Sequence, residues 1–124
     1  TLLDVVRRHE RAMFGESTDE LMDAWRKKAG DEPHPFYFTH APAGLDFYLG
    51  PRGPARRLPI RKSDGPLDPA DYVAQLDRHM QDLRGLNAFV MGNRHYLDEV
   101  PGSAAQLPGQ LVVEDRKYAI FMVP

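Results

Sequence analysis

Residues 1–30 follow a helical pattern of hydrophobic and polar positions. Apolar side chains recur every three or four residues in two stretches, of which the first stops at Gly15 and the second at Gly30. Between them, Ser17 and Glu20 stand three residues apart, which is the spacing of a capping box at the start of a helix. The pattern therefore predicts two amphipathic N-terminal helices, and each needs another surface to cover its apolar face.

From Pro33 to Lys62 the chain changes to short aromatic and β-branched runs interrupted by proline and glycine. Such runs are typical of strands joined by tight connections. The dipeptide Ala43-Gly44 suits a hairpin turn, and Pro59 makes its own strand an edge strand because proline cannot donate a hydrogen bond to a neighbour. We predict three strands here, over residues 34–40, 45–49 and 57–62.

A long helix begins at Asp68-Pro69, where the aspartate can cap the helix and the proline suits its first position. Asp71 adds a negative charge in the first turn, and Arg84-Gly85 supplies a cation and a glycine at the end. The apolar positions between these ends have three- and four-residue spacing: Tyr72, Val73, Leu76, Met80 and Leu83. We predict that this is the main helix packed on the sheet.

The C-terminal third returns to strand patterns. Residues 88–91 form an apolar run that Gly92-Asn93 could turn into a strand over residues 94–97, although a helix within residues 86–100 also fits. Residues 111–113 and 118–123 flank a polar turn, and the last run is apolar enough to lie centrally. The predicted fold is α+β: an antiparallel sheet of about five to six strands with two N-terminal helices and one long central helix.

A length of 124 residues, with 42% hydrophobic and 27% charged residues, is typical of one folded domain, so we expect a single domain over residues 1–124. Because the chain begins with threonine, it can also be a fragment of a longer protein. No apolar run reaches the roughly 20 residues that cross a bilayer, so we expect a cytoplasmic protein without membrane contact. The absence of cysteine excludes disulfides, thiolate nucleophiles and cysteine-bound metals.

A basic stretch runs from Arg52 to Lys62 with no acidic residue between Asp46 and Asp64. Cations beside aromatic side chains can bind a phosphate backbone and unstacked bases. The alternative is that these cations form the solvated face of an edge strand, where charge prevents unwanted strand pairing. The predicted nucleic-acid surface consists of Phe47, Tyr48, Arg52, Arg56, Arg57, Arg61 and Lys62.

Histidines and carboxylates supply a second candidate chemistry, since they can act as general acids and bases or bind a metal. None of them has the spacing of a metalloenzyme motif, and the chain contains neither a Gly-x-Ser-x-Gly elbow nor a phosphate-binding loop. We therefore predict no cofactor and no metal. A small hydrolase or nuclease stays open as an alternative, and it would require one cleft to contain His40, Asp46, His95 and Asp98.

The N-terminal helices carry more apolar length than a small sheet with one long helix is expected to cover, which favours a surface for a partner. The alternative is that both helices complete the core. With no catalytic motif and a formal net charge of −2, we predict a non-catalytic protein-interaction or regulatory module rather than an enzyme. Its partner would be another protein or a second copy of the chain in a homodimer. The expected contact residues are Phe14, Met22, Trp25, Arg56, Arg57 and Arg61.

Overall fold

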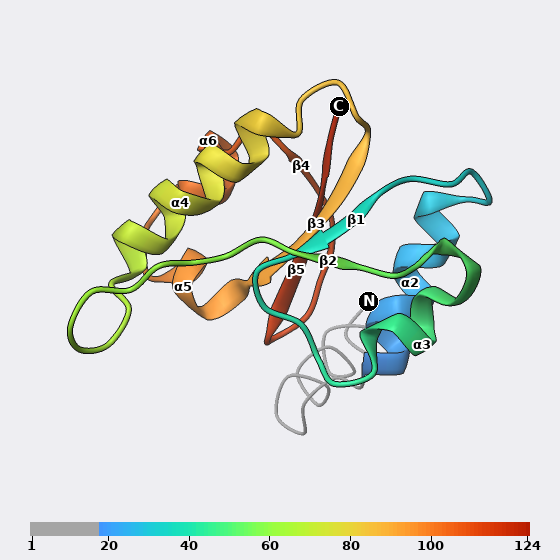
Figure 1. Cartoon of the computed structure of the whole chain (residues 1–124), viewed down its shortest axis with the longest axis horizontal. Helices are drawn as coiled ribbons and strands as arrows, with labels where there is room; N and C mark the ends of the chain where they lie inside the picture. Colours follow the sequence, from blue (N-terminus) through green and yellow to red (C-terminus); the bar gives the residue numbers. More distant parts are fainter. Residues whose placement is uncertain (1–17) are drawn as a thin grey trace, which may run out of the picture.

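The structure, a computed structural model, describes residues 18–124; the predicted first helix, with Phe14, and the capping residue Ser17 lie outside the described residues. A five-stranded sheet with the order β2-β1-β3-β5-β4 forms the centre of the described part (Figure 1). Its strands are β1 (Phe36–Phe38), β2 (Arg56–Arg57), β3 (Ala88–Asn93), β4 (Gln110–Glu114) and β5 (Tyr118–Val123).

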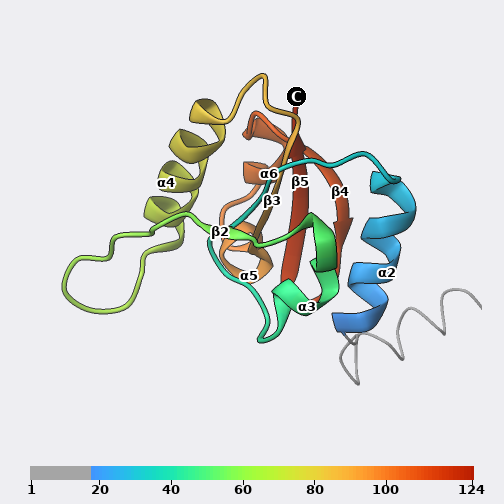
Figure 2. The same ribbon diagram turned by 45° about the vertical axis from the view of Figure 1, so that its right-hand side comes forward.

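Helices cover both faces of this sheet. Figure 2 shows α4 on one side of the strands and α2 with α3 on the other. None of the helices in the described part is both long and apolar enough to cross a bilayer. The helical elements are α2 (Thr18–Ala29), α3 (Leu45–Leu49), the 3₁₀ turn η1 (Gly50–Arg52), α4 (Pro69–Asp82), α5 (Arg94–Asp98) and α6 (Ser103–Gln106).

The α+β class is confirmed, but the sheet is mixed and the prediction of an antiparallel sheet is wrong. β1 runs parallel to both of its neighbours, β2 and β3, whereas β5 pairs antiparallel with β3 and β4. Parallel neighbours need a crossover connection, because a tight turn reverses the chain direction. The segments that hold α3 and α4 provide these crossovers.

The predicted strand over residues 45–49 is α3, and Ala43-Gly44 is not a hairpin turn. Gly44 adopts a left-handed conformation with φ of 78° and begins the helix. The helix buries Leu45 and Leu49, which are four residues apart and share one helical face, and it leaves Phe47 exposed. In a strand the same three side chains would share one face, so the short pattern fits both structures.

Two further strand predictions are corrected. The strand predicted over residues 57–62 pairs only at β2, after which the backbone N–H and C=O groups of Arg61 bond to the side chain of Gln75 on α4. The strand predicted over residues 94–97 is α5, so the open helical alternative holds for this short segment. Gly92-Asn93 continues β3 instead of turning the chain, and the Asn93 side chain caps α5 by accepting the N–H of Tyr96 at 3.2 Å.

The strongest local predictions are confirmed. α4 begins at Pro69, and the Asp68 carboxylate accepts the N–H of Asp71 at 3.3 Å as the expected cap. The C-terminal hairpin forms between β4 and β5, and β5 lies inside the sheet as its apolar sequence predicted.

Alternate residues of β3 enter two separate cores. Ala88 and Val90 pack under α4, whereas Phe89 and Met91 face α2 and α3. On the second face, the Trp25 ring packs edge-on against two phenylalanine rings, with centroid distances of 5.2 Å to Phe36 and 5.4 Å to Phe89. Burial on both faces explains why β3 and β5 read as continuous apolar runs rather than alternating ones.

Candidate functional site

A cleft of about 520 Å³ lies at the carboxyl ends of β1, β2 and β3. These ends meet at one edge of the sheet because the three strands are parallel, and such edges are where ligands bind in sheets of this kind. The turn between β4 and β5 reaches the same edge, since Tyr118 pairs with Asn93. We name it the strand-end cleft, lined by Phe38, Thr39, His40, Ala41, Arg57, Asn93, His95, Arg116, Lys117 and Tyr118.

Three hydrogen-bonded groups fix the ends of β1 and β3 beside the cleft. The Tyr72 hydroxyl, fully buried on α4, lies 2.7 Å from the Thr39 hydroxyl and accepts the backbone N–H of Asn93 at 2.9 Å. Gly92 allows this approach, because a Cβ atom at that position would lie 2.8 Å from the Tyr72 oxygen. Burial raises the pKa of Tyr72, so its hydroxyl keeps its proton. The two contacts of the Tyr72 hydroxyl therefore join α4 to the ends of both β1 and β3.

His40 is half-buried at the wall of the cleft. Its Nδ1 lies 3.3 Å from the Thr39 hydroxyl, and its ring packs against Tyr72 and Tyr96 with centroid distances of 5.4 and 5.8 Å. Burial, and secondly the charge of Arg57, lower the pKa of His40 below its ordinary value of 6.5. The imidazole is therefore neutral at neutral pH and has one ring nitrogen able to accept a proton.

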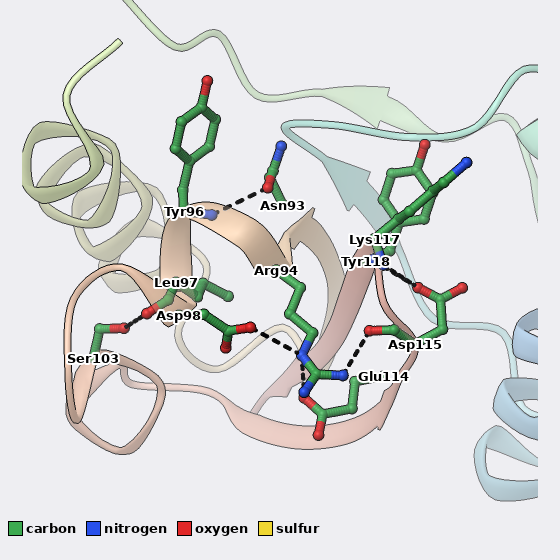
Figure 3. A network of polar contacts seen from close by, with 10 residues as sticks. All are labelled: Asn93, Arg94, Tyr96, Leu97, Asp98, Ser103, Glu114, Asp115, Lys117 and Tyr118. Carbon is green, nitrogen blue, oxygen red and sulfur yellow. Dashed lines mark hydrogen bonds and ion pairs between the residues drawn. The ribbon is translucent and has the colours of Figure 1, made fainter. Parts of the chain in front are cut away.

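The β4–β5 turn is held rigidly against the start of α5 (Figure 3). Asp115 is only 4% exposed, and its Oδ1 accepts the backbone N–H groups of Lys117 at 2.8 Å and Tyr118 at 2.7 Å. Arg94 donates from Nη1 to the Asp115 carbonyl at 2.8 Å, and its backbone N–H donates to the Lys117 carbonyl at 3.0 Å. Because Arg94 also lies 3.6 Å from Glu114, the turn that carries Lys117 is fixed at the cleft.

The cleft is locally positive although the whole chain is slightly acidic. Arg57, Arg116 and Lys117 line it together with two histidines, and none of the lining residues within the described part of the chain is acidic. Within residues 18–124, neither the Arg57 guanidinium nor the Lys117 ammonium forms an ion pair with a carboxylate. Cations without a counter-charge in one concave site attract anions, and arginine matches the geometry of phosphate.

The predicted basic surface is divided by the fold. Arg57 alone of that set enters the strand-end cleft; Arg56, on the opposite side of β2, lines a different groove with His34. Arg61 lies beside α4, and Lys62 is exposed in the loop that follows.

Arg52 has a structural environment. Its guanidinium lies over the Trp25 ring at 5.3 Å, donates to the carbonyl of Gly30 and sits 3.7 Å from Asp31. Arg52 lines the same groove as Arg56, and it is not among the residues that line the strand-end cleft.

The apolar residues predicted to contact a partner are distributed differently. Met22 and Trp25 are buried in the core under α2, at 0% and 2% exposure. Phe47, which was predicted for the nucleic-acid surface and not for a protein partner, is 85% exposed on α3, and the Tyr48 ring lies 5.7 Å from its ring. Of the predicted aromatic positions in the described part, Phe47 is therefore the one that a partner can reach most fully.

Of the four residues predicted for acid–base chemistry, the two histidines lie at the cleft and the two aspartates do not. His40 and His95 line the same cleft, whereas Asp46 accepts the N–H of Ala55 at 2.9 Å and Asp98 pairs with Arg94 at 3.5 Å. Across residues 18–124, no three histidine or carboxylate side chains gather as a metal site would require.

Sequence reasoning missed Thr39, Asn93, Arg116 and Lys117 as site residues. Arg116 and Lys117 were assigned to a polar turn, and the parallel order of β2, β1 and β3, together with the antiparallel pairing of β5 with β3, brings that turn to the edge where Arg57 lies. Comparison of the chain with protein-family models, curated proteins and solved structures finds no match. The function is therefore inferred from the geometry of the cleft.

Proposed function

We propose that the strand-end cleft binds single-stranded nucleic acid. The observation that carries the proposal is the meeting of Arg57, Arg116 and Lys117 in one cleft, whose lining among residues 18–124 contains no acidic side chain. The Arg57 guanidinium and the Lys117 ammonium can each contact a phosphate oxygen, and contacts with phosphate supply most of the sequence-independent affinity for nucleic acid. The proposed binding surface therefore differs from the predicted one: it is formed by three strand ends and the β4–β5 turn, not by a single basic strand.

Two features favour a nucleic acid over a bare anion. The aromatic residues Phe38 and Tyr118, both partly buried, line the cleft and offer bases a stacking surface, and its volume lies within the roughly 300–1,000 Å³ of ligand sites. The side-chain amide of Asn93 adds N–H donors able to bond a base or sugar, because only its oxygen is engaged by the N–H of Tyr96. A single strand suits a concave site because its bases are accessible.

The test is fluorescence anisotropy with a labelled mixed-sequence RNA oligonucleotide across a range of salt concentrations. Arg57→Ala is compared with Arg56→Ala, since both remove one exposed arginine from β2 but only Arg57 lines the cleft. Lys117→Ala is compared in the same way with Lys62→Ala. We expect each cleft variant to reduce the slope of log affinity against log salt by about 0.7, the value for one phosphate contact on a single strand.

The controls decide between surfaces. Equal losses for Arg56→Ala and Arg57→Ala would favour the original prediction of a continuous basic strand. Salt-independent binding, or no binding by the wild-type protein, would overturn the proposal.

A protein-binding role is a second proposal, supported by the exposure of Phe47 on α3. A large exposed aromatic side chain is a common anchor in interfaces, where aromatic residues carry much of the binding energy. If the chain forms a homodimer through this surface, Phe47→Ser would shift light scattering from dimer to monomer, whereas Leu86→Ser, at another exposed apolar position, would not. A monomer for the wild-type protein would exclude the homodimer.

A further inference from the structure

Two imidazoles meet on one aromatic ring at the strand-end cleft. The Tyr96 ring lies 5.8 Å from the His40 ring and 6.1 Å from the His95 ring, and both histidines line the cleft. They come from segments far apart in the sequence, the end of β1 and the start of α5. A pair of imidazoles beside cationic groups can transfer two protons in one reaction at phosphorus.

The surroundings of the two rings differ. His40 is half-buried, and the groups that face it are Thr39, Tyr72, Tyr96 and the positive Arg57, which together favour the neutral ring. His95 is exposed, and its Nε2 lies 3.7 Å from the Glu99 carboxylate. The two imidazoles therefore reach the cleft from a partly buried and an exposed position.

The hydrogen bond of His40 selects which nitrogen acts. When Nδ1–H donates to the Thr39 hydroxyl, the neutral ring presents the lone pair of Nε2 as its acceptor. Thr39 is itself held by the Tyr72 hydroxyl at 2.7 Å, so the orientation of the His40 ring depends on the buried network below it.

From these positions we propose that the cleft cleaves RNA, with His40 as general base and His95 as general acid. The proposal rests on the proposed binding of single-stranded nucleic acid and adds a ribose 2′-hydroxyl as the nucleophile. The 2′-oxygen forms a bond to the adjacent phosphorus while the bond from phosphorus to the 5′-oxygen of the next nucleotide breaks. Nε2 of His40 takes the 2′-hydroxyl proton, and protonated His95 gives a proton to the leaving 5′-oxygen.

The products are a 2′,3′-cyclic phosphate and a free 5′-hydroxyl. Proton exchange with water returns His40 to its neutral form and His95 to its protonated form, so no other reactant is consumed. Arg57 and Lys117 stabilise the negative charge that builds on the phosphate oxygens as the new bond forms.

The experiment uses the full chain and a DNA oligonucleotide that contains a single ribonucleotide, with an all-DNA oligonucleotide of the same sequence as control. We expect cleavage only after the ribonucleotide, a cyclic phosphate detected by mass spectrometry, and persistence of cleavage with a metal chelator present. His40→Ala and His95→Ala should each slow cleavage by about 10²–10⁴-fold, the usual contribution of a general acid or base. His34→Ala, a histidine at the opposite end of β1, should not.

Binding is measured on the same samples by anisotropy. Binding without cleavage of the ribonucleotide substrate would overturn this proposal and leave the proposed nucleic-acid binding intact. Cleavage of the all-DNA control, or equal activity of His40→Ala, His95→Ala and the wild-type protein, would also overturn it. Absence of binding to either oligonucleotide would instead remove the proposed function and this inference together.

Discussion

The Tyr72 hydroxyl is the buried polar group on which the cleft depends, and Tyr72→Phe removes only its oxygen. That oxygen lies 2.7 Å from the Thr39 hydroxyl and accepts the N–H of Asn93 at 2.9 Å. Both partners stand at the strand ends that line the cleft, and Thr39 is itself buried. The phenylalanine ring fills almost the same volume, so the variant isolates the two hydrogen bonds.

The expected cost follows from what the substitution leaves unpaired. A buried donor or acceptor without a partner costs about 1–3 kcal/mol. The Asn93 N–H loses its acceptor, while the Thr39 hydroxyl keeps its contact with His40 at 3.3 Å, so most of the cost arises at Asn93. We expect Tyr72→Phe to lower the free energy of unfolding by about 2 kcal/mol, or the Tm by roughly 4 °C per kcal/mol at this chain length.

A double-mutant cycle with Thr39→Val isolates the bond between the two hydroxyls. Each variant is unfolded in urea, and the free energies are extrapolated to water. Because the shared bond is lost only once, the double variant should be destabilised less than the sum of the single variants, by about 1 kcal/mol. Free energies that add within about 0.3–0.5 kcal/mol would refute the coupling.

Three further predictions concern single positions. Gly92→Ala should destabilise the protein because the added Cβ would lie 2.8 Å from the Tyr72 oxygen, and it should destabilise the Tyr72→Phe variant less. Equal shifts of the urea unfolding midpoint in both backgrounds would contradict this contact. Since the folded state holds the pKa of His40 below 6.5, the unfolded chain takes up its proton first, and the free energy of unfolding should fall as pH drops below 6.5; His40→Gln should flatten that dependence. Asp68→Ala should cost about 1 kcal/mol in thermal or urea unfolding through loss of the α4 cap, whereas Asp64→Ala should cost little.

Elements with strong local signals could be predicted from the sequence. α4 has a cap, a proline at its first position and apolar residues at helical spacing, and each of these acts within a few residues. The short segment of α3 has no such signal. Leu45, Phe47 and Leu49 satisfy the alternation of a strand, and only the burial of the two leucines on one helical face decides the structure.

The site was harder to predict because it is assembled by pairings between distant segments. The two histidines could be chosen from the sequence as candidates for acid–base chemistry, and Arg57 as a phosphate contact. Their meeting with Lys117 depends on the parallel order of β2, β1 and β3 and on the Arg94 contacts that hold the β4–β5 turn. Parallel pairing has no local signature comparable to a hairpin turn, so the sequence could not indicate this cleft.

The most direct measurement of the central claim is an NMR titration of isotope-labelled protein with a single-stranded RNA oligonucleotide. Binding at the strand-end cleft predicts that the largest amide shifts fall at residues 38–41, 57, 93, 95 and 116–118, which line it. Shifts concentrated instead around Arg56, Arg61 and Lys62, or no shifts at all, would contradict the account.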